Sequence, residues 1–237
     1  MANTGKEGSS VADFRENPCV SVNKLGQYLT ARPALRKRII HAQKHPCDPK
    51  YLRYPEAAQA IIEFLCGGRD ETILRYHQHR LLHAEPESDF DAHRLALCAE
   101  ALHRFLKASG ELALTHAVAS PADEGLPPLA LAGVAINVRP EILLRSVDRH
   151  GVMRSGVLKL YFSKHTPLDE SSGQYIATVL QLFAEQNLKQ QGEVDHRLVR
   201  VFDVFAGKVF VAPKAQQRRL GDVHLACEEI AARWPMN

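Results

Sequence analysis

Apolar residues recur at helical spacing through the first half of the chain. A polar cap or a proline opens several of these segments, and glycine or proline closes them, as is typical of helix ends. The pattern predicts a first helix from Ser21 or Asn23 through Leu29. It then predicts helices that begin at Pro33 and at Pro55 (the latter closed by Gly67-Gly68), and further helices over 70–84 and 89–108.

The pattern changes after the turn-rich segment PADEGLPPL (121–129). Short runs rich in β-branched and aromatic residues follow, and such runs indicate strands. They are LALAGVAINV, EILLRSV, GVLKLYFS, LVRVFDVF and KVFVAP, with a tight hairpin predicted at Ala206-Gly207. A helix over 169–192, capped by Asp169 or a following serine, and a last helix over about 217–233 complete the prediction.

This order of elements predicts an α+β (α/β layered) fold with a mixed central β-sheet flanked by helices. We expect a disordered N-terminal tail over 1–18, a helical region over 19–120 and a sheet core with a C-terminal helix over 121–237, in one integrated domain. The single tryptophan, Trp234, is expected to fix the last helix to the domain.

Composition adds a local basic segment to this picture. The net charge of +3 is mild, but seven lysines and arginines and one acid, Asp48, lie between Arg32 and Arg53. A basic face of this kind can neutralise phosphates, and the alternative is a solvated helix face. The candidate nucleic-acid-binding residues are Arg32, Arg36, Lys37, Arg38 and Lys44.

The five cysteines lie at 19, 47, 66, 98 and 227, with no closely spaced pair. This spacing argues against a disulfide framework or a CxxC zinc site. The N-terminal residues contain no apolar run, and no segment approaches the roughly 20 apolar residues of a membrane span. The expectation is a soluble, cytoplasmic protein without membrane contact.

Two neighbouring segments carry the candidate chemistry. VRPEILLR (138–145) places an acid after a proline, and SGVLKLYFSK (155–164) places lysines on the next predicted strand. This order resembles the active-site motif of PD-(D/E)XK nucleases. The opening VSVNKLGQYLTARPALRKRII (20–40) and the helix YIATVLQLFAEQNL (175–188) resemble the RecB-like exonuclease branch, and the order of parts matches over roughly 19–211.

The resemblance implies a restriction-endonuclease-like core in which Glu141 binds Mg²⁺ and Lys159 or Lys164 supplies the motif lysine. In such sites the ion polarises the phosphoryl oxygen and the lysine stabilises the developing charge. An upstream helical histidine, here His93, could also bind the metal. The second acid is missing, because Val157 precedes Lys159 and Phe162 precedes Lys164 at the acid position. The cysteines of the family's iron–sulfur version are missing too, so no cluster is expected.

Each residue also has a simpler interpretation. Glu141 could face solvent at a strand start, and Lys159 could lie on the exposed face of an edge strand. Asp203, within VFDVF, could be a buried acid with a shifted pKa or a solvated one. The histidines between His77 and His103, with His79 and His83 at i, i+4 spacing, favour a surface helix over a metal site.

Three functions follow from these observations. The first is a non-catalytic, degenerate nuclease-like domain that binds nucleic acid, DNA in preference to RNA, or a partner protein, in a setting such as DNA repair or bacterial phage defence. The second is an active Mg²⁺-dependent DNA nuclease that uses Glu141 and Lys159 or Lys164. The third is a protein-interaction subunit without nucleic-acid contact. The missing acid favours the first, because a site with too few carboxylates holds a hard divalent ion poorly. No GxxxxGK[ST], GxGxxG or GxSxG motif points to another chemistry.

Overall fold

A computed structural model describes residues 14–46, 54–123 and 125–236. It confirms the predicted fold class: helices and mixed sheets, with helices flanking the central sheet. The main sheet contains the strands β2 (Val118–Pro121), β5 (Ile142–Val147), β6 (Met153–Tyr161), β8 (Arg200–Asp203) and β9 (Lys208–Val211), in that spatial order, with β7 (Glu193–Val194) paired to β6.

The main sheet is mixed because a helix connects two of its central strands. β5 runs antiparallel to β2 and β6, whereas β6 and β8 are parallel. Helix α6 (Glu170–Asn187) lies between β6 and β8 in the chain, as a parallel connection requires. β9 then returns antiparallel to β8 through the predicted hairpin, where Gly207 has a positive φ of 64°.

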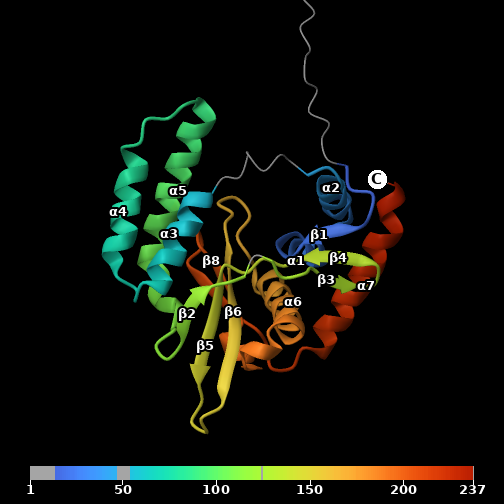
Figure 1. Cartoon of the computed structure of the whole chain (residues 1–237). Helices are drawn as coiled ribbons and strands as arrows, with labels where there is room; N and C mark the ends of the chain where they lie inside the picture. The colour runs from blue at the N-terminus through green and yellow to red at the C-terminus, as the bar shows by residue number, and fades with distance from the viewer. Residues whose placement is uncertain (1–13, 47–53, 124, 237) are drawn as a thin grey trace, which may run out of the picture.

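Two helical layers enclose this sheet (Figure 1). One contains α3 (Pro55–Cys66), α4 (Glu71–Leu82) and α5 (Asp89–Ala108) and packs on the face that carries Leu158 and Leu160. The other face carries Val157 and Tyr161 and packs on α6, with α1 (Val22–Thr30), α2 (Pro33–Lys44) and α7 (Gln217–Arg233) beyond it. β6 is therefore covered on both faces, as a central strand of a layered fold should be.

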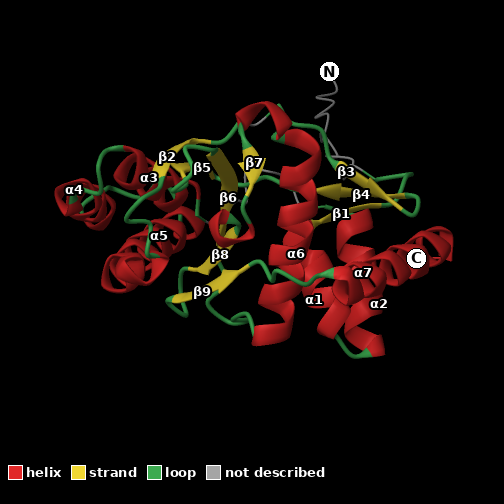
Figure 2. Ribbon diagram, turned by 90° about the horizontal axis from the view of Figure 1, so that it is seen from below, coloured by secondary structure: helices red, strands yellow, loops and turns green. Residues whose placement is uncertain are grey.

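A small second sheet joins the N-terminal segment to the middle of the chain. β1 (Cys19–Ser21) runs parallel to β4 (Val134–Asn137), which forms a hairpin with β3 (Leu129–Leu131). The run LALAGVAINV is thus two strands, and its turn occurs at Ala132-Gly133, both with positive φ. This sheet lies on the side of α1 and α7 (Figure 2).

Most predicted helix starts agree with the structure. Ser21 caps α1 by accepting a hydrogen bond from the Lys24 amide, and Asp169 caps α6 through a capping box with Ser172. α6 ends at Asn187, earlier than expected, and a 3₁₀ turn over Lys189–Gln191 follows.

Trp234 connects the last helix to the N-terminal part of the described chain. Its side chain is 2% exposed, and its indole N–H donates to the Arg15 carbonyl at 3.0 Å. The predicted disordered tail falls largely on residues 1–13, which lie outside the described part of the chain. None of the described helices is long and apolar enough to cross a membrane.

Candidate functional site

Glu141 and Lys159 lie directly opposite each other at one end of the β5–β6 pair. Ile142 pairs with Leu158 in the antiparallel register, and the Glu141 amide donates to the Leu158 carbonyl at 3.1 Å. One carboxylate oxygen of Glu141 forms an ion pair with the Lys159 ammonium group, and the other accepts from the Leu160 amide at 2.7 Å. The structure therefore brings together the acid and the first of the two candidate lysines.

Both side chains are largely buried. The Glu141 side chain is 17% exposed and the Lys159 side chain 11%. The interpretation of Glu141 as a solvent-facing residue is therefore wrong, and so is that of Lys159 as an edge-strand residue, because β6 is central in the sheet. Lys164 instead lies in the loop after β6, where its ammonium group pairs with Glu100 at 2.7 Å near the surface.

The position for a second carboxylate next to this pair is apolar. Side chains two residues apart on a strand share a face, so Val157 and Tyr161 flank Lys159 on the same face of β6. Val157 is 1% exposed and belongs to the hydrophobic core. The strand, all of whose residues are described, therefore supplies no carboxylate at this end.

Asp203 is the nearest acid on the neighbouring strand, where it is paired in register with Tyr161. It is fully buried, and burial raises the pKa of its carboxyl group. One of its oxygens accepts from the Leu168 amide at 2.9 Å and the other from the Ala206 amide at 3.1 Å. Asp203 therefore holds two loops in place, and of the two interpretations open from the sequence it is the buried acid with a shifted pKa.

The donor set at Glu141 does not fit Mg²⁺. The ion needs several oxygen ligands, whereas Glu141 directs both of its oxygens at N–H donors and its neighbour Val157 has none to offer. Among the described residues, no group of three or more His, Cys, Asp or Glu side chains is placed to hold a metal ion. His93 lies exposed on α5.

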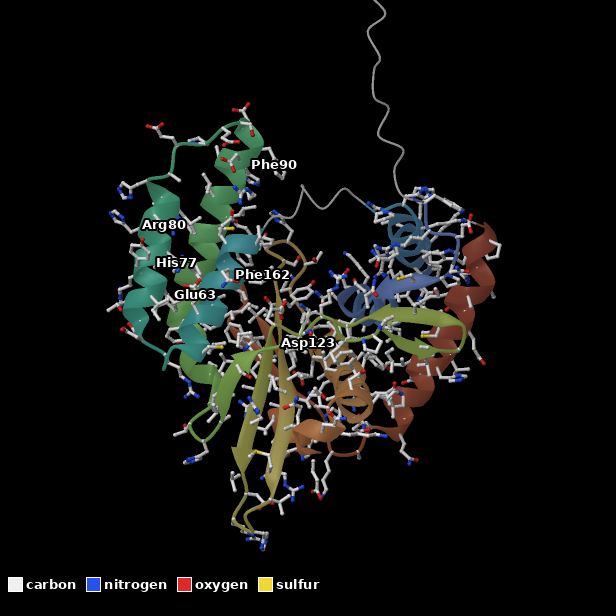
Figure 3. The ribbon with its side chains drawn as sticks, in the orientation of Figure 1. Glu63, His77, Arg80, Phe90, Asp123 and Phe162 are labelled. Atoms are coloured by element: carbon white, nitrogen blue, oxygen red, sulfur yellow. The ribbon has the colours of Figure 1, made fainter. Side chains whose placement is uncertain are left out.

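The other histidines follow the outer surface of the helical layer. His77 of α4 pairs with Glu63 of α3 at 2.7 Å and so joins these two helices (Figure 3). That contact also lowers the pKa of the Glu63 carboxyl group. His79 and His83 stack on each other with ring centroids 4.0 Å apart. The first contact connects two helices and the second lies at the C-terminal end of α4, as the surface-helix interpretation expects.

A chain of hydrogen bonds leads from the Lys159 face of β6 to the surface. The Tyr161 hydroxyl donates to the Thr166 carbonyl and accepts from the Gln27 amide, both at 2.7 Å. The Gln27 oxygen in turn accepts from the Lys24 ammonium group at 2.9 Å. Burial lowers the pKa of Lys24, whose side chain lines an open groove.

We call this hollow the α2 groove. It has a volume of about 960 Å³ and lies between α1, α2 and the loop from β6 to α6. Its cationic lining comprises Lys24, Arg32, Lys37 and Arg38, joined by His41, and apolar residues such as Leu35 form much of the rest. Asp169 is the one acid among the described residues that line it, and its carboxylate accepts from the Ser172 amide at 2.7 Å, which lowers its pKa.

Two predicted phosphate-binding residues are turned inward instead. Arg36 pairs with Glu229 of α7 at 3.0 Å and also donates to the carbonyls of Tyr28, Leu29 and Ala31. Lys44 is buried and donates to the Trp234 carbonyl at 2.8 Å. The predicted basic face therefore shrinks to Arg32, Lys37 and Arg38, because the folded chain uses the other two charges to join helices.

Neither Lys24 nor the loop over Thr166–Asp169 can be assigned to this groove from the sequence alone. Lys24 is separated from Arg32 by most of a helix, so only the packing of α1 against α2 shows that the two share a surface.

No family model matches the chain, and no curated protein matches it either.

Proposed function

We propose that this protein is a nuclease-like domain that binds nucleic acid, DNA in preference to RNA, without cleaving it. One observation carries the non-catalytic part of the proposal: Glu141 directs both carboxylate oxygens at Lys159 and Leu160, and Val157 occupies the place of a second acid. An ion pair of this kind stabilises the end of the sheet. The described residues place no group of three or more His, Cys, Asp or Glu side chains to hold an ion, whereas a catalytic Mg²⁺ needs several oxygen ligands.

The arrangement of the sheet supports the link to PD-(D/E)XK nucleases. Pro140 and Glu141 come immediately before β5, Lys159 lies on the adjacent β6, and α6 then connects β6 to the parallel strand β8. This is the order of parts on which the resemblance rests. The proposal is therefore that the chain keeps a restriction-endonuclease-like core whose catalytic position has become structural.

The α2 groove supports the binding part of the proposal. Arg32, Lys37 and Arg38 are all exposed, and in the described part of the chain none of them forms an ion pair with a carboxylate. Such cations can exchange their counterions for the phosphates of a nucleic acid, which makes binding favourable and dependent on salt. Exposed apolar surface beside them, including Leu35 at 46% exposure, offers contact to bases or sugars.

Fluorescence anisotropy with labelled DNA and RNA oligonucleotides tests this proposal. We expect DNA binding that weakens as the salt concentration rises. In the variant Lys37→Glu/Arg38→Glu, the slope of log K against log salt concentration should be smaller in magnitude by about 2, about one for each phosphate that the variant no longer neutralises. The matched control is Arg75→Glu, which changes an exposed arginine of α4 on the far helical layer. Equal binding by the groove variant and the control would contradict the assignment of the groove.

The same samples test the absence of cleavage. Incubation of the oligonucleotides with Mg²⁺ or Mn²⁺ should leave them intact. Metal-dependent cutting that disappears in Glu141→Ala would show that the protein is an active nuclease and would refute the non-catalytic proposal. Association with a protein instead of nucleic acid would move it to the interaction class, and a place in DNA repair or phage defence remains part of the proposal.

A further inference from the structure

A second cationic pocket lies at the opposite end of the main sheet. It has a volume of about 740 Å³ and is formed by the end of β5, the start of β6, the segment after α5 and the 3₁₀ turn His196–Leu198. Its charged lining includes His116, Arg149, His150, Arg154, Arg197 and Arg200. We call it the hairpin pocket, because the β5–β6 hairpin that borders it projects from the sheet (Figure 1).

The hairpin pocket is separate from the Glu141 site. Glu141 precedes the first residue of β5, whereas Ser146 of the pocket lies near the end of that strand. At about 3.4 Å per residue, the two positions are roughly 17 Å apart along the strand. The described linings of the α2 groove and of this pocket have no residue in common.

Two of the four arginines in the pocket are already neutralised. Arg154 donates to Asp148 through two nitrogens, at 2.9 and 2.7 Å, and also pairs with Glu193. The contact with Arg154 is the main reason why the pKa of Asp148 falls to about 2. Arg197 pairs with Asp195 at 2.7 Å. Asp148 and Asp195, the carboxylates in the described lining of the pocket, are therefore occupied by these arginines.

The other two arginines, Arg149 and Arg200, are not neutralised in this way. Arg200 is half-buried and donates to the carbonyls of Arg197 and Leu112, and burial lowers its pKa. Arg149 donates to the His150 ring at 3.0 Å. Within the described residues, no carboxylate lies within ion-pair distance of Arg149 or Arg200. The charge of Asp195 raises the pKa of Arg200, but this carboxylate already pairs with Arg197.

From this arrangement we infer that the hairpin pocket binds a small ligand that carries a pyrophosphate group, such as a nucleoside diphosphate. A half-buried guanidinium without a counter-charge is unfavourable, and an anionic ligand would offset that cost. The planar N–H donors of arginine match phosphate oxygens, so the half-buried Arg200 and the exposed Arg149 each bind one phosphate. The volume lies within the range of about 300–1,000 Å³ that is usual for small-molecule sites.

Isothermal titration calorimetry of the full chain with inorganic pyrophosphate and with ADP tests this inference. We expect one binding site per chain, and a loss of affinity of roughly tenfold in Arg149→Gln, because one charge-assisted contact is removed. Arg200→Gln should lose at least as much. Since Arg200 also holds two backbone carbonyls, circular dichroism must show that this variant is folded, and Arg149→Gln, whose side chain makes no contact to the backbone that the structure records, carries the test independently.

Two controls locate the anion. Arg75→Gln removes one exposed arginine from α4 and should bind pyrophosphate as the wild type does. Lys37→Gln should also keep this affinity, because Lys37 lines the α2 groove and not the hairpin pocket. The inference is overturned if millimolar pyrophosphate and ADP give no binding heat, if Arg149→Gln binds as tightly as the wild type, or if Lys37→Gln loses the site. None of these outcomes depends on whether the protein binds DNA.

Discussion

Replacing Glu141 with alanine would leave the Lys159 ammonium group in a largely buried position without its carboxylate. The side chain of Lys159 is 11% exposed, and Glu141 also accepts a hydrogen bond from the Leu160 amide. Breaking a buried ion pair by removing one partner costs about 3–5 kcal/mol, and a single hydrogen bond to a charged group contributes about 1.5–3 kcal/mol. Because both side chains keep some contact with water, we expect a loss at the lower end, about 3 kcal/mol.

A double-mutant cycle separates the ion pair from the other effects of the substitution. Lys159→Met keeps most of the side-chain volume and removes the charge, so Glu141→Ala/Lys159→Met should no longer contain the uncompensated ammonium group. We expect the double variant to be more stable than Glu141→Ala, with an interaction energy of about 2 kcal/mol. In a chain of this size, a loss of about 3 kcal/mol corresponds to a fall in Tm of roughly 6–12 °C.

Urea denaturation provides the measurement. Circular dichroism follows the helices, and the fluorescence of Trp234 follows the contact between the two ends of the chain, because this is the only tryptophan in the sequence and it is buried. A loss below about 1 kcal/mol in Glu141→Ala, together with additive effects in the cycle, would mean that the pair is solvated and does not stabilise the end of the sheet.

Three further predictions concern stability. Arg36→Gln should lower the free energy of unfolding by about 1–3 kcal/mol in urea denaturation, because it removes the bonds to Glu229 and to three carbonyls. Its DNA affinity, measured by anisotropy, should stay within about twofold of the wild type. A selective loss of DNA binding would contradict the inward role of Arg36. Gly156→Ala should destabilise the fold by about 3 kcal/mol, because the new Cβ would lie 2.5 Å from backbone atoms of Leu198. A Tm equal to that of the wild type would rule out this close approach. Asp148→Asn should lower Tm at pH 7 but not at pH 2. The pKa of Asp148 is lowered in the folded protein to about 2, so its carboxylate contributes stability above about pH 4, and this stability is lost as the pH falls to about 2. An equal effect of the substitution at both pH values would contradict the ion pair with Arg154.

Local signals in the sequence predicted most helices and the longer strands. Pro33 and Pro55 do begin helices, and the predicted last helix over 217–233 coincides with α7. β1 could not be predicted, because three residues are too few to show an alternation and its partner β4 is more than a hundred residues away. LALAGVAINV concealed a hairpin, since its turn contains Ala132, a residue that rarely adopts a positive φ.

The candidate site was predictable only in part. The motif order placed Glu141 opposite a lysine, but the sequence offered both Lys159 and Lys164, and only the register of β5 and β6 decides between them. Likewise, nothing local distinguishes Arg36, which joins α2 to α7, from its neighbour Lys37 in the groove. Charges that stabilise a fold and charges that bind a ligand look alike until their partners from distant segments are known.

One measurement tests the central proposal most directly: labelled DNA incubated with the wild-type protein in Mg²⁺, with anisotropy and fragment length read from the same sample. We expect binding that falls with added salt and with Lys37→Glu/Arg38→Glu, while the DNA stays at full length. Shortened DNA in the wild type, with full-length DNA in Glu141→Ala, would show that the Glu141–Lys159 pair belongs to a working nuclease and would contradict the non-catalytic proposal.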